Sequence, residues 1–194
     1  MKKKIAITGG IGSGKSSVLH TFRGMGYPTF SCDEIYREII DTPAYIQKIK
    51  EVFPECIVEG KIDRKILAKL VFQNEEKLTA LNAIAHPFIM ERLLASMNNC
   101  AGETVFAEVP LLFEGNYEKL FDKVIVVQRN EEQRIQSVVK RDGISSKEVE
   151  NRISAQFKYD DPKNENRLKN ANVIFLNNEG DLFSLKNKIK NLIF

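Results

Sequence analysis

Cysteine is scarce in this chain of 194 residues, which also lacks a long apolar run and a large excess of one charge. Its three cysteines are far apart and form no C-x-x-C pair, which argues against a disulfide framework or a zinc site and predicts reduced thiols. No apolar run approaches the roughly 18 residues that a membrane helix requires. The net charge of +3 is too small to indicate a nucleic-acid-binding protein. We therefore expect a cytoplasmic globular protein without nucleic-acid or membrane partners.

Strand and helix patterns alternate along the chain. Short runs rich in β-branched residues predict five strands, at residues 3–8, 28–31, 103–109, 123–128 and 172–176. Such alternation indicates an α/β fold with a doubly wound, mainly parallel five-stranded sheet, in which ligands bind at the carboxyl ends of the strands. Residues 33–98 show helical spacing with a break at His86-Pro87. This stretch is longer than one crossover connection requires, so it predicts a separate helical subdomain.

A glycine-rich motif follows the first predicted strand. Residues 9–16 read GGIGSGKS, which matches G-x-x-x-x-G-K-[ST] at every fixed position. Glycines let such a loop curl so that backbone N–H groups point at phosphate oxygens, and the positive end of the next helix adds to the attraction. Lys15 then reaches the β- and γ-phosphates, and the Ser16 hydroxyl can ligate Mg²⁺. The predicted nucleotide-binding residues are Gly10, Gly12, Ser13, Gly14, Lys15, Ser16 and Ser17.

Motifs of other nucleotide-binding proteins are missing. The dinucleotide fingerprint G-x-G-x-x-G is not met, because Lys15 stands where a third glycine is required. Switch GTPases carry D-x-x-G and N-K-x-D, and the Asn187-Lys188 pair here lacks the aspartate two residues on. A small P-loop protein with a helical insertion after its second strand is typical of a small-molecule kinase. Such kinases cover the phosphate donor with an arginine-bearing lid that excludes water.

Two carboxylates follow predicted strands at the edge where the motif lies. Asp33 comes just after residues 28–31, where a carboxylate can accept the proton of an attacking hydroxyl, and it is also a good N-cap for the helix that begins there. Glu108 ends the third strand, where P-loop proteins place an acidic residue that holds Mg²⁺ through water. Pairing with a neighbouring basic residue is the alternative for Glu108.

Basic residues are dense in the two helices predicted after the fourth strand. We expect one arginine to reach the γ-phosphate, where charge develops during transfer, and the others to be solvated. Arg141 is the candidate, because the Asp142-Gly143 pair after it marks a helix end that can act as a hinge. His86 is either a substrate contact or a structural residue. The segment PLLFE at 110–114 can form a pocket wall or part of the core.

These residues together resemble the dephospho-CoA kinase family. The opening ITGGIGSGKS at residues 7–16 is the family's form of the phosphate loop, and Asp33 stands where the family has its proposed catalytic base. Further landmarks follow in the family's order: His86-Pro87, VPLLFE at 109–114, Arg141-Asp142, Ala155-Gln156 and Asn177-Asn178. The likeness runs nearly from end to end, and the order and spacing of the landmarks make it specific.

The resemblance implies an ATP-dependent transferase that phosphorylates the ribose 3′-hydroxyl of dephospho-CoA, the final step of coenzyme A biosynthesis. The implied domains are a nucleotide-binding core at 1–32, 99–130 and 171–194, a helical substrate subdomain at 33–98, and a lid with its following helices at 131–170. ATP and Mg²⁺ are the expected cofactors, and dephospho-CoA is the expected small-molecule partner. We expect a monomer or a weak homo-oligomer.

The resemblance also implies roles for individual residues. Catalysis falls to Asp33, Lys15 and Arg141. Substrate contacts fall to Asp33, His86, Leu111 and Glu114, and Mg²⁺ to Ser16 with Glu108 in the outer shell.

Two positions depart from the family's pattern. Ser137 replaces an arginine that many members carry four residues before the lid arginine, and Asn172 replaces the aspartate of an Ala-Asp pair. Both bear on adenine and lid contacts rather than on the phosphate loop. Another nucleotide or nucleoside kinase with the same core is the first alternative, although no D-G-[FY]-P-R segment follows the third strand. A nucleotide-dependent switch or binding module is the second alternative.

Overall fold

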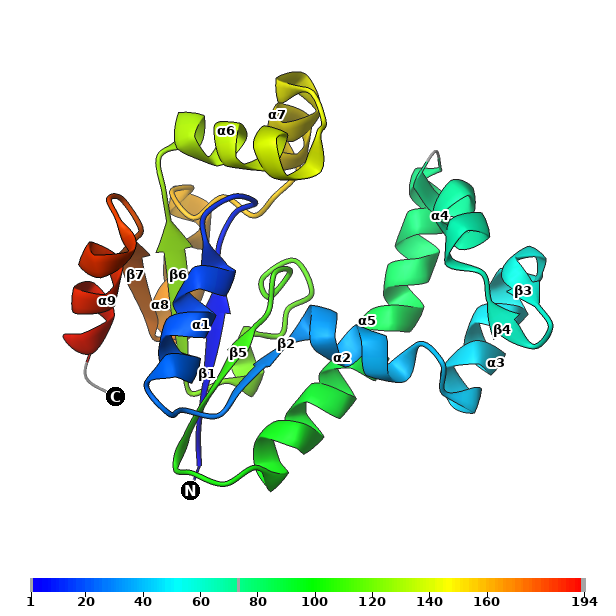
Figure 1. Cartoon of the computed structure of the whole chain (residues 1–194), viewed down its shortest axis with the longest axis horizontal. Helices are drawn as coiled ribbons and strands as arrows, with labels where there is room; N and C mark the ends of the chain where they lie inside the picture. Colours follow the sequence, from blue (N-terminus) through cyan, green and yellow to red (C-terminus); the bar gives the residue numbers. More distant parts are fainter. Residues whose placement is uncertain (1, 73, 193–194) are drawn as a thin grey trace. The chain divides into compact units, whose positions relative to one another are not determined.

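The computed structural model describes residues 2–72 and 74–192, and the chain divides into two compact units. The first unit holds the residues up to Thr29 together with those from Cys100 onward, and the second holds Phe30–Asn99. Figure 1 traces the chain through both. Within the described residues, no helix combines the length and apolar character needed to cross a membrane.

A five-stranded parallel sheet with strand order β2-β5-β1-β6-β7 forms the centre of the first unit, although β2 begins at the last residue of that unit's first stretch and ends in the second unit. Its strands are β1 (Lys3–Thr8), β2 (Thr29–Ser31), β5 (Thr104–Glu108), β6 (Lys123–Gln128) and β7 (Val173–Asn177). β1 pairs in parallel with β5 and β6, and β6 pairs in parallel with β7. Near the carboxyl end of β1, Ile7 lies opposite Glu108 of β5 and Ile125 of β6. The predicted doubly wound α/β fold with five strands is confirmed.

Apolar side chains hold α1 (Lys15–Gly24) and α9 (Leu182–Lys190) against this sheet. Successive side chains of a strand point to opposite faces, and Ile5 and Ile7 of β1 join a buried core that includes Phe22 of α1 and Leu185 of α9. Phe22 also stacks on Phe106 of β5, with ring centroids 3.7 Å apart. Because β1 and α1 are packed in one core, the loop that joins them has fixed ends.

A helical hairpin follows β6. It consists of α6 (Glu131–Asp142) and α7 (Ser146–Ser154), and we call it the α6–α7 hairpin. The Asn130 side chain caps α6 by accepting a hydrogen bond from the Gln133 N–H at 3.3 Å, and Gly143 ends the helix with a φ of 68°. Ser145 and Glu148 form a capping box at the start of α7. The first unit also contains η2 (Glu118–Leu120), η3 (Pro162–Asn164) and α8 (Glu165–Asn170).

The second unit is mostly helical. Its elements are α2 (Cys32–Ile39), α3 (Pro43–Val52), η1 (Pro54–Cys56), β3 (Ile57–Val58), β4 (Lys61–Ile62), α4 (Arg64–Phe72) and α5 (Glu75–Asn99). Tyr45 is fully buried in its core, where the rings of Tyr36 and Phe88 meet it edge-on. The short antiparallel pair of β3 and β4 was not predicted. It turns at Glu59 and Gly60, which both have positive φ angles.

Two local predictions for the second unit are wrong. The helix does not break at His86-Pro87, because α5 runs through Pro87. A proline inside a helix removes one backbone hydrogen bond, but buried residues on both sides of it, such as Ala85 and Met90, hold this helix in place. Asp33 is not the N-cap of α2. Ser31 has that role, since its Oγ accepts a hydrogen bond from the Glu34 N–H at 3.1 Å, and Asp33 lies in the first turn.

Candidate active site

The loop between β1 and α1 has the curled shape expected of a phosphate-binding loop. Gly9, Gly12 and Gly14 have φ angles of 142°, 76° and 92°, a region that residues with a side chain rarely adopt. A hydrogen bond of 3.2 Å from the Ser13 N–H to the Gly10 carbonyl closes the curl. Because α1 begins at Lys15, the N–H groups of its first turn end in this loop and favour an anion there.

Lys15 lies along the same loop. Its Nζ donates hydrogen bonds to the carbonyl oxygens of Gly9 at 3.1 Å and Gly10 at 3.0 Å. The ammonium group is therefore held at the mouth of the curl rather than extended into solvent. Phosphate oxygens bound in the loop would offer it stronger, charged acceptors than these carbonyl groups.

Ser16 and Glu108 form a hydrogen-bonded pair of oxygen-bearing side chains beside the loop. The Ser16 Oγ donates a hydrogen bond of 3.0 Å to Glu108 Oε1, and Glu108 is 9% exposed at the end of β5. Among the residues described, no cluster of three or more His, Cys, Asp or Glu side chains could hold a metal ion by itself. Mg²⁺ takes one or two oxygens from a protein and the rest from phosphate and water, so this pair fits that ion.

Asn178, which follows β7, fastens the other end of the loop. Its Nδ2 donates a hydrogen bond of 2.8 Å to the Ser13 carbonyl. A Cβ added to Gly14 would lie 2.1 Å from the same Nδ2 and would displace the Asn178 amide, and the φ of 92° itself favours glycine there. The Ser13 hydroxyl is buried and makes no hydrogen bond with the described protein atoms. The loop thus keeps one buried donor that a bound ligand can satisfy.

Arg134 of α6 and Gln156 contact the opposite side of the loop at Ile11. The Arg134 Nε donates to the Ile11 carbonyl at 2.9 Å, and the Ile11 N–H donates to Gln156 Oε1 at 2.9 Å. Arg134 is half-buried, and burial lowers the pKa of its guanidinium. Arginine still stays charged at neutral pH because its guanidinium is strongly basic.

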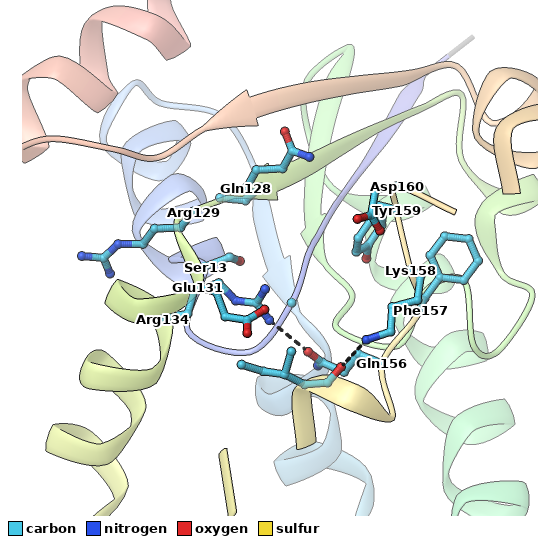
Figure 2. Close-up of a pocket in the computed structure, with 13 residues that line it drawn as sticks. Ser13, Gln128, Arg129, Glu131, Arg134, Gln156, Phe157, Lys158, Tyr159 and Asp160 are labelled. Carbon is cyan, nitrogen blue, oxygen red and sulfur yellow. Dashed lines mark hydrogen bonds between the residues drawn. The ribbon is translucent and has the colours of Figure 1, made fainter. Parts of the chain in front are cut away.

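A cavity of about 260 Å³ borders the loop at Gly10 and Ser13. Figure 2 shows the Arg134 guanidinium and the Gln156 amide pointing toward each other, while the Arg129 side chain extends away from them. Burial raises the pKa of Tyr159, which also lines the cavity, to about 12, so its hydroxyl stays protonated at neutral pH. The lining combines cationic, acidic and aromatic side chains, which suits a polar ligand.

The segment at 110–114, for which a pocket wall and core packing were the two alternatives, lies against residues 157–159 and does not contribute to the lining of the cavity described above. The backbone N–H of Phe157 donates to Glu114 Oε1 at 3.0 Å, and the Phe113 ring stacks on Phe157 with centroids 4.6 Å apart. Phe113 is buried, whereas Leu111 is 37% exposed. Glu114 thus positions a backbone segment beside the cavity, and Leu111 has its side chain at the surface.

Arg167 packs against the aromatic rings of this segment. Its guanidinium lies over the rings of Phe113 and Phe157, at 5.3 and 5.4 Å from their centroids, and pairs with the buried Glu118 carboxylate. Burial of the Glu118 carboxyl acts to raise its pKa, but hydrogen bonds from Arg167 and the backbone, together with the charges of Arg167 and Lys119, hold the pKa below its usual value. The pair thus stabilises the aromatic stack next to the cavity.

Arg141 lies in the last turn of α6. Its side chain is 65% exposed and makes two hydrogen bonds to the Asp142 carboxylate, at 2.6 and 2.8 Å. One turn earlier, the Ser137 hydroxyl accepts a hydrogen bond of 2.9 Å from Arg129 Nη1. A guanidinium thus lies beside position 137 although the residue there is serine.

Asp33 and His86 belong to the second unit, whereas the loop, Glu108, Glu114 and Arg141 belong to the first. Asp33 is exposed in the first turn of α2. His86 is half-buried in α5, and burial lowers the pKa of its imidazole. A lowered pKa keeps that ring neutral at physiological pH.

Sequence reasoning gave no site role to three residues that contact the loop: Arg134, Gln156 and Asn178. Gln156 and Asn178 belong to the landmarks of the resemblance, and Arg134 is one of the basic residues that are dense in the helices after β6. Each lies more than a hundred positions from the loop residue that it binds. No local pattern predicts such a contact, although the landmarks Ala155-Gln156 and Asn177-Asn178 are a sequence signal for two of the three.

Comparison with known proteins gives a family match over most of the chain. A family model described as dephospho-CoA kinase matches residues 3–182. A dephospho-CoA kinase of Thermus thermophilus is 37% identical over 186 residues, covering 96% of this chain and 88% of the relative. The crystal structure of TT1252 from Thermus thermophilus is 36% identical, with a TM-score of 0.77, and the match covers 97% of this chain and 95% of that one.

A more distant structure shows the fold alone. Shikimate kinase from Acinetobacter baumannii is 16% identical to this chain, with a TM-score of 0.55, over 98% of this chain and 92% of that one. The fold described above is therefore shared with a kinase of another name.

Proposed function

The chain belongs to the dephospho-CoA kinase family, and we propose that its phosphate loop, Asp33 and Arg141 divide the work of that reaction. As a member it is an ATP-dependent phosphotransferase that converts dephospho-CoA into coenzyme A, the final step of CoA biosynthesis. The observation that carries the site assignment is the loop itself. It combines three left-handed glycines, a lysine held at its mouth and a Ser16–Glu108 pair beside it.

The loop binds the donor. Backbone N–H groups of residues 12–17 receive the phosphates of ATP, and the Lys15 ammonium exchanges its two carbonyl acceptors for oxygens of the β- and γ-phosphates. The buried Ser13 hydroxyl gains the partner that it lacks among the protein atoms. These interactions position the γ-phosphoryl group and neutralise its charge, which is most of what phosphoryl transfer requires from a protein.

Ser16 and Glu108 are the residues that would hold Mg²⁺. Glu108 accepts the Ser16 hydrogen, which leaves the serine oxygen to serve as a ligand, and the Glu108 carboxylate suits an outer-shell role through water. Mg²⁺ supplies neutralisation of the charge on the phosphate oxygens when it is bound.

Asp33 and Arg141 complete the assignment. The Asp33 carboxylate is exposed in the first turn of α2 and orients and deprotonates the ribose 3′-hydroxyl. Arg141 leaves Asp142 to stabilise the transferring phosphoryl group as charge develops on it. His86, Leu111 and Glu114 contribute to the binding of dephospho-CoA. A monomer or weak homo-oligomer in the cytoplasm stays our prediction.

The test is an assay of ATP consumption with Mg²⁺ and four acceptor conditions: dephospho-CoA, AMP, adenosine and none. We expect consumption that requires dephospho-CoA, with the new phosphate mapped to the ribose 3′ position by mass spectrometry. Turnover with AMP or adenosine alone would keep the fold but reject the substrate assignment. Turnover without any acceptor dependence would favour a nucleotide-dependent switch.

Asp33→Asn separates the acceptor side of this site from the donor side. We expect turnover to fall by roughly 10²–10⁴ while ATP affinity stays nearly unchanged, because a general base contributes about that much to rate. Lys15→Ala is the matched variant on the donor side, and it should lower ATP affinity as well as rate. Retained turnover in Asp33→Asn would reject its role as the base.

A further inference from the structure

Ile11 lies at the tip of the phosphate loop, and both its backbone N–H and its carbonyl group make hydrogen bonds. Ile11 donates its N–H to Gln156 Oε1 at 2.9 Å and accepts at its carbonyl from Arg134 Nε, also at 2.9 Å. Arg134 Nη2 donates to the same Gln156 oxygen at 3.5 Å, so the two partners also contact each other. The loop tip therefore has fixed hydrogen bonds to α6 and to the segment that follows α7.

The Ile11 side chain joins the apolar core of the α6–α7 hairpin. The buried members of that core are Val138, Val149 and Ile153, at 1%, 0% and 8% exposure, and all three belong to the hairpin. Ile11 packs against them together with the partly buried hairpin residues Ile135, Val139 and Ile144. A residue of the loop thus completes a core that otherwise consists of hairpin residues.

The glycines on either side of Ile11 allow this close approach. A Cβ added to Gly10 would lie 2.3 Å from Arg134 Nη2, and one added to Gly12 would lie 2.6 Å from the Arg134 carbonyl oxygen. Three consecutive loop residues therefore contact the first half of α6. Close-packed groups of this kind move together, because separating them opens a void or breaks hydrogen bonds.

We propose that Ile11 is a positioning residue that fastens the α6–α7 hairpin to the phosphate loop. This rests on the proposed function, in which the loop receives ATP and α6 carries Arg141. When the loop adjusts to the phosphates, the hairpin adjusts with it, so that occupancy of the donor site sets the position of the hairpin. A hairpin detached from the loop would let water reach the γ-phosphorus, releasing ADP and inorganic phosphate without transfer to an acceptor.

The experiment compares Ile11→Ala with Ile144→Ala. Both variants truncate an isoleucine in the same apolar core, but only Ile11 belongs to the loop. Hydrogen–deuterium exchange is measured for both variants and the unaltered chain, with Mg²⁺ and a non-hydrolysable ATP analogue present or absent. In the unaltered chain and in Ile144→Ala we expect the analogue to slow exchange both at residues 12–17 and in the hairpin at 131–154. In Ile11→Ala we expect slower exchange at residues 12–17 only.

Steady-state kinetics give a second readout. Ile11→Ala should lower kcat for dephospho-CoA by between about tenfold and a hundredfold, as misplaced catalytic groups do, with an unchanged KM for that acceptor. The same variant should raise the share of ATP that is hydrolysed without acceptor. Ile144→Ala should change neither quantity, although its melting temperature should fall as in Ile11→Ala.

Three outcomes separate this proposal from the proposed function. Hairpin protection that persists in Ile11→Ala, or is lost equally in Ile144→Ala, would overturn the positioning role and leave the kinase assignment intact. Protection of both regions with no phosphorylation of dephospho-CoA would reject the substrate and keep the role of Ile11. Protection of neither region in the unaltered chain would reject ATP binding by the loop.

Discussion

The two halves of α6 have opposite surroundings. In the first half, Arg134 is half-buried against the loop and Ile135 packs against the buried core of the α6–α7 hairpin. In the last turn, the Arg141 side chain is 65% exposed, and a Cβ added to Gly143 would meet nothing within 4 Å. In the sequence these residues belong to one charged helix. In the structure, the first half of α6 is held against the loop, whereas the last turn of α6 is exposed to solvent.

The largest effect should come from the exposed end. We expect Arg141→Ala to lower the rate of phosphoryl transfer by roughly 10²–10⁴ with an unchanged melting temperature, because a solvent-exposed ion pair adds little stability. Arg134→Ala is the matched variant in the first half of α6 and should lower the melting temperature as well. Steady-state kinetics and thermal unfolding of both proteins test the comparison. Equal melting temperatures in the two variants would remove the distinction between the first half and the last turn of α6.

Two glycines test the same comparison through stability. Gly12 has a φ of 76° and no room beside the Arg134 carbonyl, whereas Gly143 has a φ of 68° and open space. Gly12→Ala should cost about 2–5 kcal/mol of unfolding free energy, from backbone strain plus overpacking, and should weaken ATP binding. Gly143→Ala should cost about 1–2 kcal/mol from strain alone and leave ATP binding unchanged.

Urea unfolding and ATP titration measure both effects. A Gly12→Ala protein as stable as Gly143→Ala would mean that α6 moves away from the loop at no cost. That result would contradict the conclusion that the first half of α6 is held against the loop. It would also contradict the role proposed for Ile11.

The smallest effect concerns the Glu118–Arg167 pair and appears as a pH dependence of the protein's stability. Glu118 titrates below its ordinary pKa of 4.5 in the folded protein because Arg167 binds its charged form. A lowered pKa gives stability that is fully present above pH 4.5 and is lost as the pH falls through the lower folded value. Glu118→Gln should cost about 1–3 kcal/mol at pH 7 and flatten the loss of stability below pH 4.5.

Thermal unfolding between pH 3 and pH 7 checks this prediction, with Glu132→Gln on the exposed face of α6 as the control. An acid profile of Glu118→Gln that matches the unaltered chain would show that the Arg167 pair does not contribute to stability.

The sheet and the loop could be predicted from sequence because their signals are local. Each buried strand is a short β-branched run, and the motif at 9–16 is contiguous. In the structure, β1 and β6 have the predicted bounds, and the ends of the other three strands differ from the prediction by one residue. The contacts that hold the loop are another matter, because Arg134, Gln156 and Asn178 are brought to it by tertiary structure alone.

Local rules also failed where packing overrides them. Pro87 should end a helix, but α5 continues through it because buried residues on both sides keep the helix in place. Ser31 rather than Asp33 caps α2, a shift of two residues that frees the Asp33 carboxylate from the capping bond. Both side chains are good N-caps, so sequence alone could not decide between them.

The second unit interrupts the first at a single place. The chain leaves the first unit after Thr29, the first residue of β2, and returns at Cys100, shortly before β5, and these two strands are neighbours in the sheet. Neighbouring strands are only about 5 Å apart, so a segment joined to both can be replaced without altering the strand order. Under the proposed function, the segment between the two strands carries Asp33 and His86, which contact the acceptor. A chimaera that exchanges residues 32–99 should therefore keep its ATP site while acquiring the acceptor specificity of the transplanted segment.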